Sequence, residues 1–459
     1  MVLAGAVLRL IGIGHKSFWI DEIASVAIAR RPAPVFWHFL WHDEGNMAAY
    51  YVLLRPWLHV GYGEGTVRLL SVIPGIISIP LMYVLGRRLF GNRVGTLSAL
   101  FLALNACAIS VSQEARAYSF VVLLVLLSTY FFVRLIEEPT SGHATMYAVI
   151  AGLTCYFHYF GLLAPAAQYA SLVGIPPRRG RWKLLILAAA IIVLLASPIL
   201  WLIHAQDTGH ISWVGPPSFL ELYHLGAFLA ADSGKAVGGL LLALDLVLVG
   251  CFGKRFAVVW RDDVEQRWRY LLIASSVITP IVITLLLSIL RPAFYHRFLI
   301  ICLPGWIMMT ALGAEEICSL SWRRLAITLV CLLSIVSAWL VYRRTTEDWR
   351  SLVTYLIANS GPGDRVLYYQ SVGEFAGESY RDWLQRGGQR PIAIGINAGN
   401  DEWLHEVAGE RRVWLVVYRA NARDAEVDHI QQELSRQNLR LKFVSFYPGV
   451  GLMEFAARE

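Results

Sequence analysis

Long apolar runs are the feature that most constrains what this chain can fold into. Each run has about 20 mostly apolar residues, enough for one α-helix to cross the hydrocarbon core of a bilayer. A helix also satisfies its own backbone hydrogen bonds inside lipid, so many such runs predict a polytopic α-helical membrane protein. The clear candidate spans are residues 66–86, 94–112, 117–136, 183–204, 236–252, 270–290, 298–313 and 325–342.

Two other regions add to this count. Residues 144–176 are interrupted by His158, Gly161 and Pro165, which predicts two short spans that meet near His158. Residues 1–14 have the composition of the end of a further span. The sequence therefore predicts about eleven transmembrane helices.

The density of charge changes near residue 345. Residues 1–345 hold 44 charged side chains, whereas the much shorter segment 346–459 holds 29. This second segment also alternates helical and strand-like runs, a pattern typical of a small α/β layer domain. We therefore predict a membrane domain over 1–345, with a long first outer loop at 15–67, followed by a small α/β domain over 346–459.

Basic residues gather in the loops on one side of the predicted spans. Those loops hold 15 Lys and Arg residues, and the positive-inside rule makes them cytoplasmic. The N-terminus is then inside, and the C-terminal domain faces outward. The net charge of +7 reflects this topology and gives no reason to expect nucleic acid as a partner. The basic loops are 86–93, 134–143, 176–183, 253–269 and 314–324.

Several function classes are excluded by the same sequence. The six cysteines lie in or beside apolar runs and show no metal-ligand spacing such as CxxC, which argues against a disulfide scaffold or a zinc module. There is also no Walker-type phosphate loop, so ATP is not the expected energy source.

Ionisable and aromatic polar residues concentrate in the loops that are predicted to face outward. Such groups are costly at a membrane edge unless they are paired, so a functional role is the default hypothesis. The candidate site residues are Asp21, Glu22, His42, Asp43, Glu44, Gln113, Glu114, Arg116, Tyr118, His158, Tyr159, His296 and Arg297.

Structural interpretations of these residues stay open. Asp21 and Glu22 can cap and charge the start of a helix over 21–30. Glu114 and Arg116 can form a structural ion pair, and Arg297 can lie at the interface with its charge in the headgroup region.

Two polar residues within the apolar regions also have a structural interpretation. His158 can be a helix-end histidine whose hydrogen bonds are satisfied. Asp245 lies inside a span, where we expect a packing role or a local hydrogen bond.

Taken together, the outer residues fit a reaction of two substrates. A carboxylate can accept a proton from an acceptor hydroxyl, and Arg and His can neutralise a phosphate that leaves with negative charge. Without ATP, the donor must carry its own activated bond, which a lipid phosphate ester does. Sugar transfer from a lipid-linked donor needs this set of groups.

The order and spacing of five motifs resemble a known family. The chain is similar to the GT-C superfamily of integral-membrane glycosyltransferases, in particular the bacterial branch related to protein O-mannosyltransferases and the lipid A aminoarabinose transferase. The resemblance covers about residues 10–345. The motifs are Phe18-Trp19-Ile20-Asp21-Glu22, Ala49-Tyr50-Tyr51-Val52-Leu53-Leu54, Glu64 through Arg68-Leu69-Leu70-Ser71, Ser112-Gln113-Glu114-Ala115-Arg116-Ala117-Tyr118, and His296-Arg297-Phe298.

The resemblance implies a GT-C fold and a polyprenyl-phosphate-linked monosaccharide as donor. It implies that Asp21 is the catalytic base, with Glu22 beside it, and that the second acidic site falls at Asp43 and Glu44. Some members of the superfamily bind a divalent cation near these acids while others need none, and His42 could join Asp43 and Glu44 as a ligand.

The remaining motifs imply the donor side of the site. By the resemblance, Glu114 and Tyr118 line the cavity, and Arg297 holds the donor phosphate with Arg116 and His296. Gln113, His158 and Tyr159 are further cavity-lining candidates.

The prediction is thus an inverting hexosyl or pentosyl transferase of the bacterial inner membrane, with its C-terminal domain periplasmic or extracellular. The acceptor would be a glycan, a glycolipid or a protein. The alternatives are a transporter or flippase of lipid-linked sugars, a structural or receptor role in the envelope, and an oligosaccharide ligase with a diphosphate-linked donor.

Overall fold

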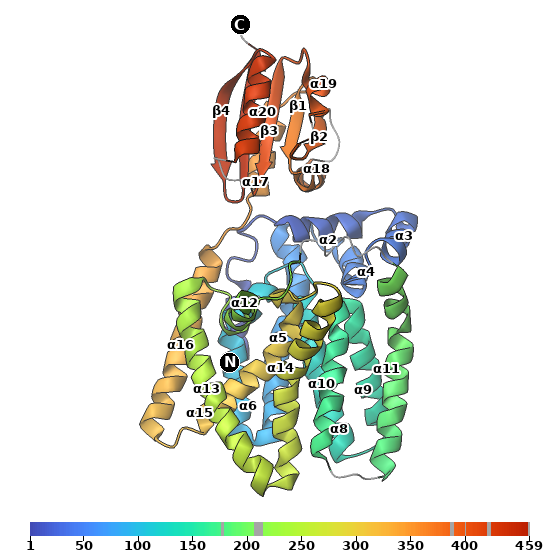
Figure 1. Cartoon of the computed structure of the whole chain (residues 1–459), viewed down its shortest axis with the longest axis vertical. Helices are drawn as coiled ribbons and strands as arrows, with labels where there is room; N and C mark the ends of the chain where they lie inside the picture. The colour runs from blue at the N-terminus through green and yellow to red at the C-terminus, as the bar shows by residue number, and fades with distance from the viewer. Residues whose placement is uncertain (176–178, 206–213, 386–389, 400, 420–423, 458–459) are drawn as a thin grey trace. The chain divides into compact units, whose positions relative to one another are not determined.

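The computed structural model describes residues 1–175, 179–205, 214–385, 390–399, 401–419 and 424–457 (Figure 1). The chain divides into two compact units. One contains Met1–Ile13 and Arg31–Arg343, and the other contains Gly14–Arg30 and Arg344–Glu459. The predicted loops 176–183 and 205–235 lie partly outside the described residues.

Helices build the first unit, and its long members confirm the predicted polytopic α-helical fold. Among the described residues, seven helices are long and apolar enough to cross a membrane, or eight if one bent pair counts as a span. The number of eleven stays a prediction. The α-helices are α1 (Val2–Leu10), α3 (Ala33–His42), α4 (Ala48–Trp57), α5 (Glu64–Phe90), α6 (Asn92–Leu104), α7 (Ala106–Ser112), α8 (Tyr118–Glu137), α9 (Ser141–Phe157), α10 (Leu163–Ala170), α11 (Arg179–Ala205), α12 (Phe219–Ala230), α13 (Lys235–Asp262), α14 (Val264–Leu290), α15 (Leu303–Glu315) and α16 (Leu320–Arg343). In the described ranges, the 3₁₀ turns η1 (Tyr159–Leu162), η2 (Ser171–Gly174) and η4 (His296–Cys302) join some of these helices.

The bent pair is α6 and α7, which meet at 56° at Asn105. The Asn105 side chain accepts a hydrogen bond from the Ala108 N–H at 2.8 Å and so caps α7. Its amide donates to the carbonyls of Leu229 and Ala230 at the end of α12. One buried amide therefore satisfies the backbone groups that a broken helix and a helix end leave open.

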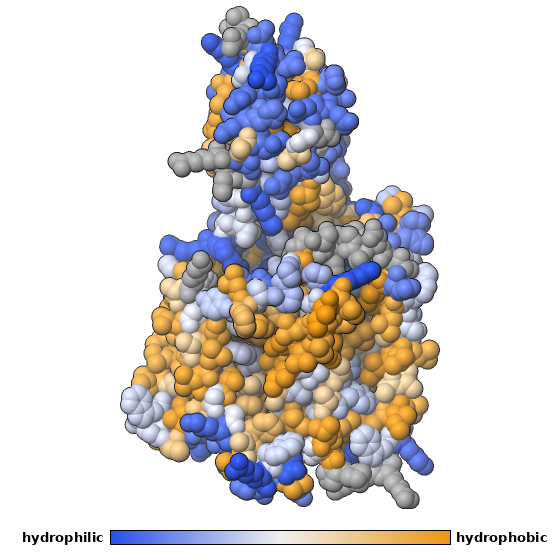
Figure 2. Space-filling view, viewed as in Figure 1, coloured by the Kyte–Doolittle hydropathy of each residue, from blue (hydrophilic) through white to orange (hydrophobic). Residues whose placement is uncertain are grey.

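Burial separates central helices from lipid-facing ones. The apolar window of His296–Glu315, which includes α15, is 89% buried, whereas that of Arg181–His204 in α11 is 28% buried. Figure 2 shows apolar side chains over much of the surface of the helical unit. These exposed side chains are what a bilayer would cover.

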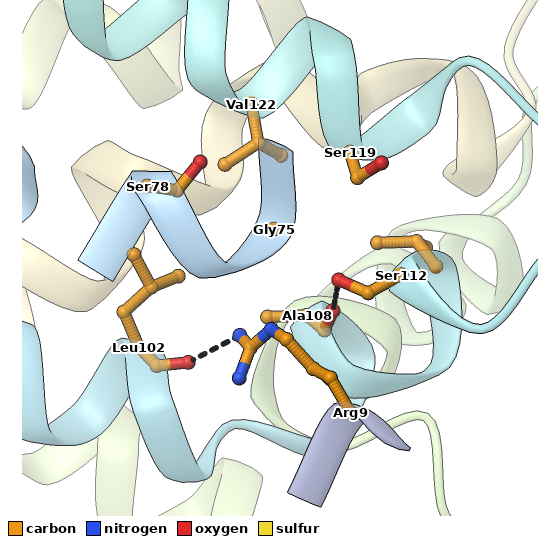
Figure 3. Close-up of a pocket in the computed structure, with 9 residues that line it drawn as sticks. Arg9, Gly75, Ser78, Leu102, Ala108, Ser112, Ser119 and Val122 are labelled. Carbon is orange, nitrogen blue, oxygen red and sulfur yellow. Dashed lines mark hydrogen bonds between the residues drawn. The ribbon is translucent and has the colours of Figure 1, made fainter. Parts of the chain in front are cut away.

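Arg9 is a buried charge inside the helical unit. Its guanidinium donates to the carbonyls of Gly5, Leu102 and Ala103 at 3.1–3.2 Å, which ties α1 to the end of α6 (Figure 3). The side chain is 1% exposed and lines a small cavity with Ser78. Backbone carbonyls in place of a carboxylate thus make the burial of this cation tolerable.

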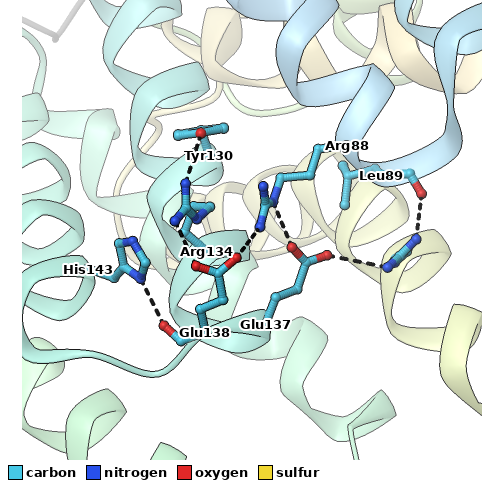
Figure 4. A network of polar contacts seen from close by, with 8 residues as sticks. Arg88, Leu89, Tyr130, Arg134, Glu137, Glu138 and His143 are labelled. Atoms are coloured by element: carbon cyan, nitrogen blue, oxygen red, sulfur yellow. Dashed lines mark hydrogen bonds and ion pairs between the residues drawn. The ribbon is translucent and has the colours of Figure 1, made fainter.

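A second polar cluster joins α5, α8 and α14 at the ends that are predicted to be cytoplasmic (Figure 4). Arg88 contacts Glu137 at 2.6 Å and Glu138 at 3.0 Å, and Arg269 also reaches Glu137 at 3.3 Å. Hydrogen bonds from Arg134 and Arg88 lower the pKa of the Glu138 carboxyl. The cluster is partly exposed, so its main contribution is to fix the register of three helix ends.

The second unit is a small α/β domain, as the charge and pattern of its sequence predict. Its five strands lie in the order β2-β1-β3-β5-β4, with β1, β2 and β3 parallel and β4 and β5 antiparallel. Both faces of β3 are buried, which explains its continuous apolar run. The elements are α2 (Ile20–Arg30), α17 (Trp349–Asn359), β1 (Arg365–Tyr369), α18 (Val372–Leu384), β2 (Ile392–Ile396), α19 (Trp403–Val407), β3 (Arg412–Tyr418), α20 (Ala425–Arg436), β4 (Leu439–Tyr447) and β5 (Val450–Ala457).

Residues Gly14–Arg30 belong to this second unit, although the sequence places them in the first outer loop of the membrane domain. The predicted boundary near residue 345 lies close to the change of unit between Arg343 and Arg344. The assignment of two functional domains stays a prediction.

The closest helix approach gives a test of this packing. A Cβ placed on Gly313 in α15 would overlap the backbone carbonyl of Leu248 in α13, whereas a Cβ on Gly250 in α13 meets open space. We expect Gly313→Ala to lower the stability of the detergent-solubilised protein by about 1–3 kcal/mol, as overpacking does. Gly250→Ala, the matched control, should leave stability equal or slightly higher. Thermal unfolding of both variants measures this, and equal melting temperatures would contradict the close contact.

Candidate active site

A partly buried ion pair is the centre of the candidate site in the first unit. The Arg297 guanidinium contacts the Glu114 carboxylate, and their side chains are 16% and 14% exposed. Arg297 also lies over the ring of Tyr118, 5.2 Å from its centroid. The structure thus brings three of the predicted site residues together from the connection between α7 and α8 and from the start of η4.

Local structure explains the position of the Glu114 loop. Helix α7 ends at Ser112 and α8 begins at Tyr118, so residues 113–117 make a tight connection in which the Arg116 N–H donates to the Glu114 carbonyl at 2.7 Å. The Ser71 hydroxyl of α5 donates to the Arg116 carbonyl at 2.9 Å. The bond from Ser71 fixes the loop to α5. Arg116 follows Glu114 by two residues in this loop and is half-buried.

Gln113 has a structural role in the same loop. Its amide donates to the carbonyls of Arg9 and Ile11, at 3.1 and 2.8 Å. This side chain therefore holds the end of α1 against the connection between α7 and α8.

His158 lies beside this group. It has extended backbone between α9 and η1, and its Nδ1 accepts the Phe160 N–H at 3.2 Å. Its ring is 5.9 Å from that of Tyr118 and 5.4 Å from that of Phe298. With Nδ1 as acceptor, the proton of a neutral ring is on Nε2, and this buried atom has no hydrogen-bond partner in the described part of the chain. His158 therefore has the predicted role at a helix end, and the Nε2–H of its neutral ring can donate a further hydrogen bond.

The first outer loop reaches the same turn through Asn46. The Asn46 Oδ1 accepts the N–H of Tyr159 at 3.1 Å. Glu44 is half-buried, whereas His42 and Asp43 are exposed. The structure therefore brings the Asn46 side chain of this loop to the backbone of Tyr159.

A set of possible cation ligands in the first unit includes His296, the neighbour of Arg297 in η4. Ligand atoms of Glu221, His224 and His296 lie within 4.8 Å of one another. Histidine nitrogens and a carboxylate are the ligands that Zn²⁺ prefers. Among the described residues, these three form such a group, and the predicted set at 42–44 does not. The Glu-x-x-His spacing on α12, which puts both side chains on one helix face, is the signal that could have found Glu221 and His224.

Asp21 and Glu22 belong to the second unit and differ from each other in role. Glu22 is fully buried, and its carboxylate accepts the Trp19 N–H at 3.2 Å, the return bond of a capping box at the start of α2. Asp21 is half-buried in the first turn of the same helix, and its carbonyl accepts the Ser25 hydroxyl at 2.9 Å. The structural interpretation therefore fits Glu22.

Part of the chain matches a known protein family. The family model described as dolichyl-phosphate-mannose-protein mannosyltransferase matches residues 47–202. No curated protein sequence matches the chain.

Solved structures match over nearly the whole chain at low sequence identity. ArnT from Cupriavidus metallidurans in the apo state is 10% identical, with a TM-score of 0.61, and covers 98% of this chain and 96% of its own. The same protein bound to undecaprenyl phosphate gives 12% identity, a TM-score of 0.60 and coverages of 99% and 97%. The archaeal oligosaccharyltransferase AglB from Archaeoglobus fulgidus, in complex with an inhibitory peptide and a dolichol-phosphate, is 12% identical, with a TM-score of 0.53. The match covers 90% of this chain and 68% of AglB.

The chain therefore has the fold of these structures, the GT-C fold that the resemblance implies, and residues 47–202 match the mannosyltransferase family model.

The cation group can be tested without an activity assay. We expect the purified protein to bind one Zn²⁺, and Glu221→Gln or His224→Ala to weaken binding by more than about 100-fold, since even the loss of a supporting contact costs 10–100-fold. Affinity should fall at acidic pH, because a protonated imidazole cannot ligate. Titration calorimetry measures this, with Asp43→Asn as control. Equal affinity in all variants would contradict the assignment.

Proposed function

We propose that this protein transfers a monosaccharide from a polyprenyl-phosphate-linked donor to an acceptor hydroxyl at the outer face of the bacterial inner membrane. The observation that carries the proposal is the partly buried Glu114–Arg297 pair in a chain with the GT-C fold. ArnT, which has that fold, is bound to undecaprenyl phosphate in one of its structures, and this supports the same class of donor here.

The Glu114–Arg297 pair suits the binding of a phosphate. An arginine can donate two parallel hydrogen bonds to a phosphate, and such charge-assisted bonds are stronger where water is scarce. Glu114 stabilises the Arg297 cation and fixes its direction, while Tyr118 supports the guanidinium from one face. A partly buried charge at a membrane edge is costly unless it is paired, which favours a functional role.

His158 adds a neutral donor next to this pair. Its buried Nε2 has no hydrogen-bond partner in the part of the chain that the structure describes, and both it and Arg297 lie beside Tyr118. A phosphate oxygen would satisfy this N–H without bringing a further positive charge. The family resemblance adds Arg116 and His296 on the same donor side.

The proposed reaction is a single displacement with inversion. Asp21 accepts the proton of the acceptor hydroxyl as its oxygen attacks the anomeric carbon. The bond from that carbon to the phosphate oxygen breaks, and the electron pair leaves with the polyprenyl phosphate, whose charge Arg297 neutralises. Of the two neighbouring acids, Asp21 is the better candidate because the Glu22 carboxylate caps α2.

Asp21→Asn should lower the rate of sugar transfer by about 10²–10⁴-fold, because an amide cannot accept the proton. Asp428→Asn is a matched control, since Asp428 is an exposed acid of the same unit. The measurement is release of polyprenyl phosphate from a panel of polyprenyl-phosphate monosaccharides in detergent, with an acceptor extract. Normal turnover of Asp21→Asn at equal expression would exclude this residue as the base.

Arg297→Gln should lower the same rate by roughly 10²–10³-fold and weaken the binding of polyprenyl phosphate, because a donor to the leaving charge is lost. The matched control is Arg323→Gln. Arg323 forms a comparably exposed pair with Glu315 at 3.1 Å, in a loop predicted to face the cytoplasm. If both variants lost activity and stability equally, the pair at Arg297 would be structural.

A further inference from the structure

The segment that carries Asp21 is held by the C-terminal part of the chain within the second unit. The backbone N–H of Ile20, at the start of α2, donates to the Glu347 carboxylate at 2.8 Å. The Ser17 hydroxyl accepts the Arg350 N–H at 3.2 Å. Both bonds join residues that are more than 300 positions apart in the sequence.

Glu347 is the centre of these contacts. Its carboxylate is nearly fully buried, at 1% side-chain exposure, and it also accepts hydrogen bonds from Trp349 Nε1 at 2.9 Å, the Tyr418 hydroxyl at 3.0 Å and Arg419 at 2.9 Å. Burial, followed by the charge of Glu347, raises the pKa of Tyr418, so its hydroxyl stays protonated and donates. One carboxylate therefore connects the end of β3 to the first turn of α2.

The chemistry at that helix end is specific. The first N–H groups of an α-helix have no partner inside the helix, and the helix dipole makes this end positive. The buried Glu347 carboxylate accepts the Ile20 N–H, and its negative charge is favourable beside the positive end of the helix dipole. This contact lies one residue before Asp21. Glu347 thus determines where α2 begins and how its first turn is directed.

Apolar and cation–π contacts fix the rest of the segment. The Phe18 ring packs against Tyr380 and Trp383 of α18, with centroids 6.2 and 5.7 Å apart. At the other end of α2, the Arg30 guanidinium lies 5.6 Å from the centroid of Trp383. Both ends of the Asp21 helix therefore rest on α18.

The contacts lie where an α/β sheet usually binds a ligand. In the order β2-β1-β3 the chain leaves β1 in one direction for β2 and crosses to the other side for β3. Ligands bind at such a switch point, beyond the carboxyl ends of the strands. Here β1 and β3 are each followed by a non-glycine residue with positive φ, Gln370 at 63° and Arg419 at 50°, and Arg419 contacts Glu347. Backbone strain of this kind is typical of binding edges.

We propose that the C-terminal α/β domain holds the catalytic segment in this position, with Glu347 as the positioning residue for Asp21. The proposal rests on the function proposed above, in which Asp21 is the base. The domain uses its strand-end edge to bind a part of its own chain, and it contributes to the rate of transfer through the direction of one helix turn.

Glu347→Gln should lower kcat by about 10²-fold, the scale of a misplacement near 1 Å in a catalytic group. The KM for the donor should be unchanged, because the proposed phosphate ligands belong to the other unit. Asp364→Asn is a closely matched control. This buried carboxylate also accepts bonds from a tryptophan (Trp414, 3.0 Å), an arginine (Arg412, 2.9 Å) and a backbone N–H (Gly361, 3.0 Å), but all of these lie within the C-terminal segment.

Two readouts separate positioning from a loss of stability. In the Asp21→Asn background, Glu347→Gln should change kcat less than about 2-fold, since a group that acts through Asp21 has nothing further to lose. Hydrogen exchange of residues 17–30 in the full-length protein should increase in Glu347→Gln and stay unchanged in Asp364→Asn. Arg30→Met, a surface change at the other end of α2, should give a smaller loss of kcat with the same dependence on Asp21.

The proposal is overturned if Glu347→Gln keeps normal kcat, if Asp364→Asn loses kcat equally, or if the losses from Glu347→Gln and Asp21→Asn multiply. Full activity of Asp21→Asn would instead refute the catalytic role of Asp21. The hydrogen-exchange result would then still decide whether Glu347 holds the segment.

Discussion

The cost of placing charge where water is scarce is the constraint on which the helical unit depends. Inside a bilayer, helices satisfy their own backbone, and each buried charge needs a partner. Arg9 contacts backbone carbonyls, and Asp245 of α13 accepts the Trp306 indole N–H of α15 at 2.9 Å. This bond joins two helices, whereas the sequence predicts a packing role or a local hydrogen bond for Asp245. The Glu114–Arg297 pair differs from these, because each of its charges is matched by an opposite charge from a distant part of the sequence.

Features with a local origin were predictable from the sequence. Local sequence patterns predict the long apolar helices, the break of the helix at His158 and the strands β1 and β3. Strand β2 does not follow from its local sequence, because Ile-Ala-Ile-Gly-Ile is short, contains small residues and lies at the edge of the sheet, so its own propensity is weak. Its parallel pairing with β1 supplies what the local sequence lacks.

Features that depend on distant contacts were not predictable. The resemblance pointed to both Glu114 and Arg297, but no spacing rule says that residues 183 positions apart form a pair. The resemblance implied a possible cation set at 42–44, whereas Glu221, His224 and His296 come together through the contact of α12 with η4, which no local pattern indicates. In the same way, nothing near Ile20 indicates that its N–H is satisfied by a residue 327 positions away.

This last contact explains why a membrane protein of this class would need a folded domain to organise a helix of 11 residues. A helix this short is marginal by itself, because nucleation costs more than its few hydrogen bonds return. The hydrogen bond that the Glu22 carboxylate accepts from the Trp19 N–H is local. It keeps the first turn closed but cannot set the direction of the helix. Direction requires a partner whose own position is fixed. Glu347 meets that requirement because the end of β3 and the indole of Trp349 hold its carboxylate, so the rigidity of the sheet is passed to the turn that contains Asp21.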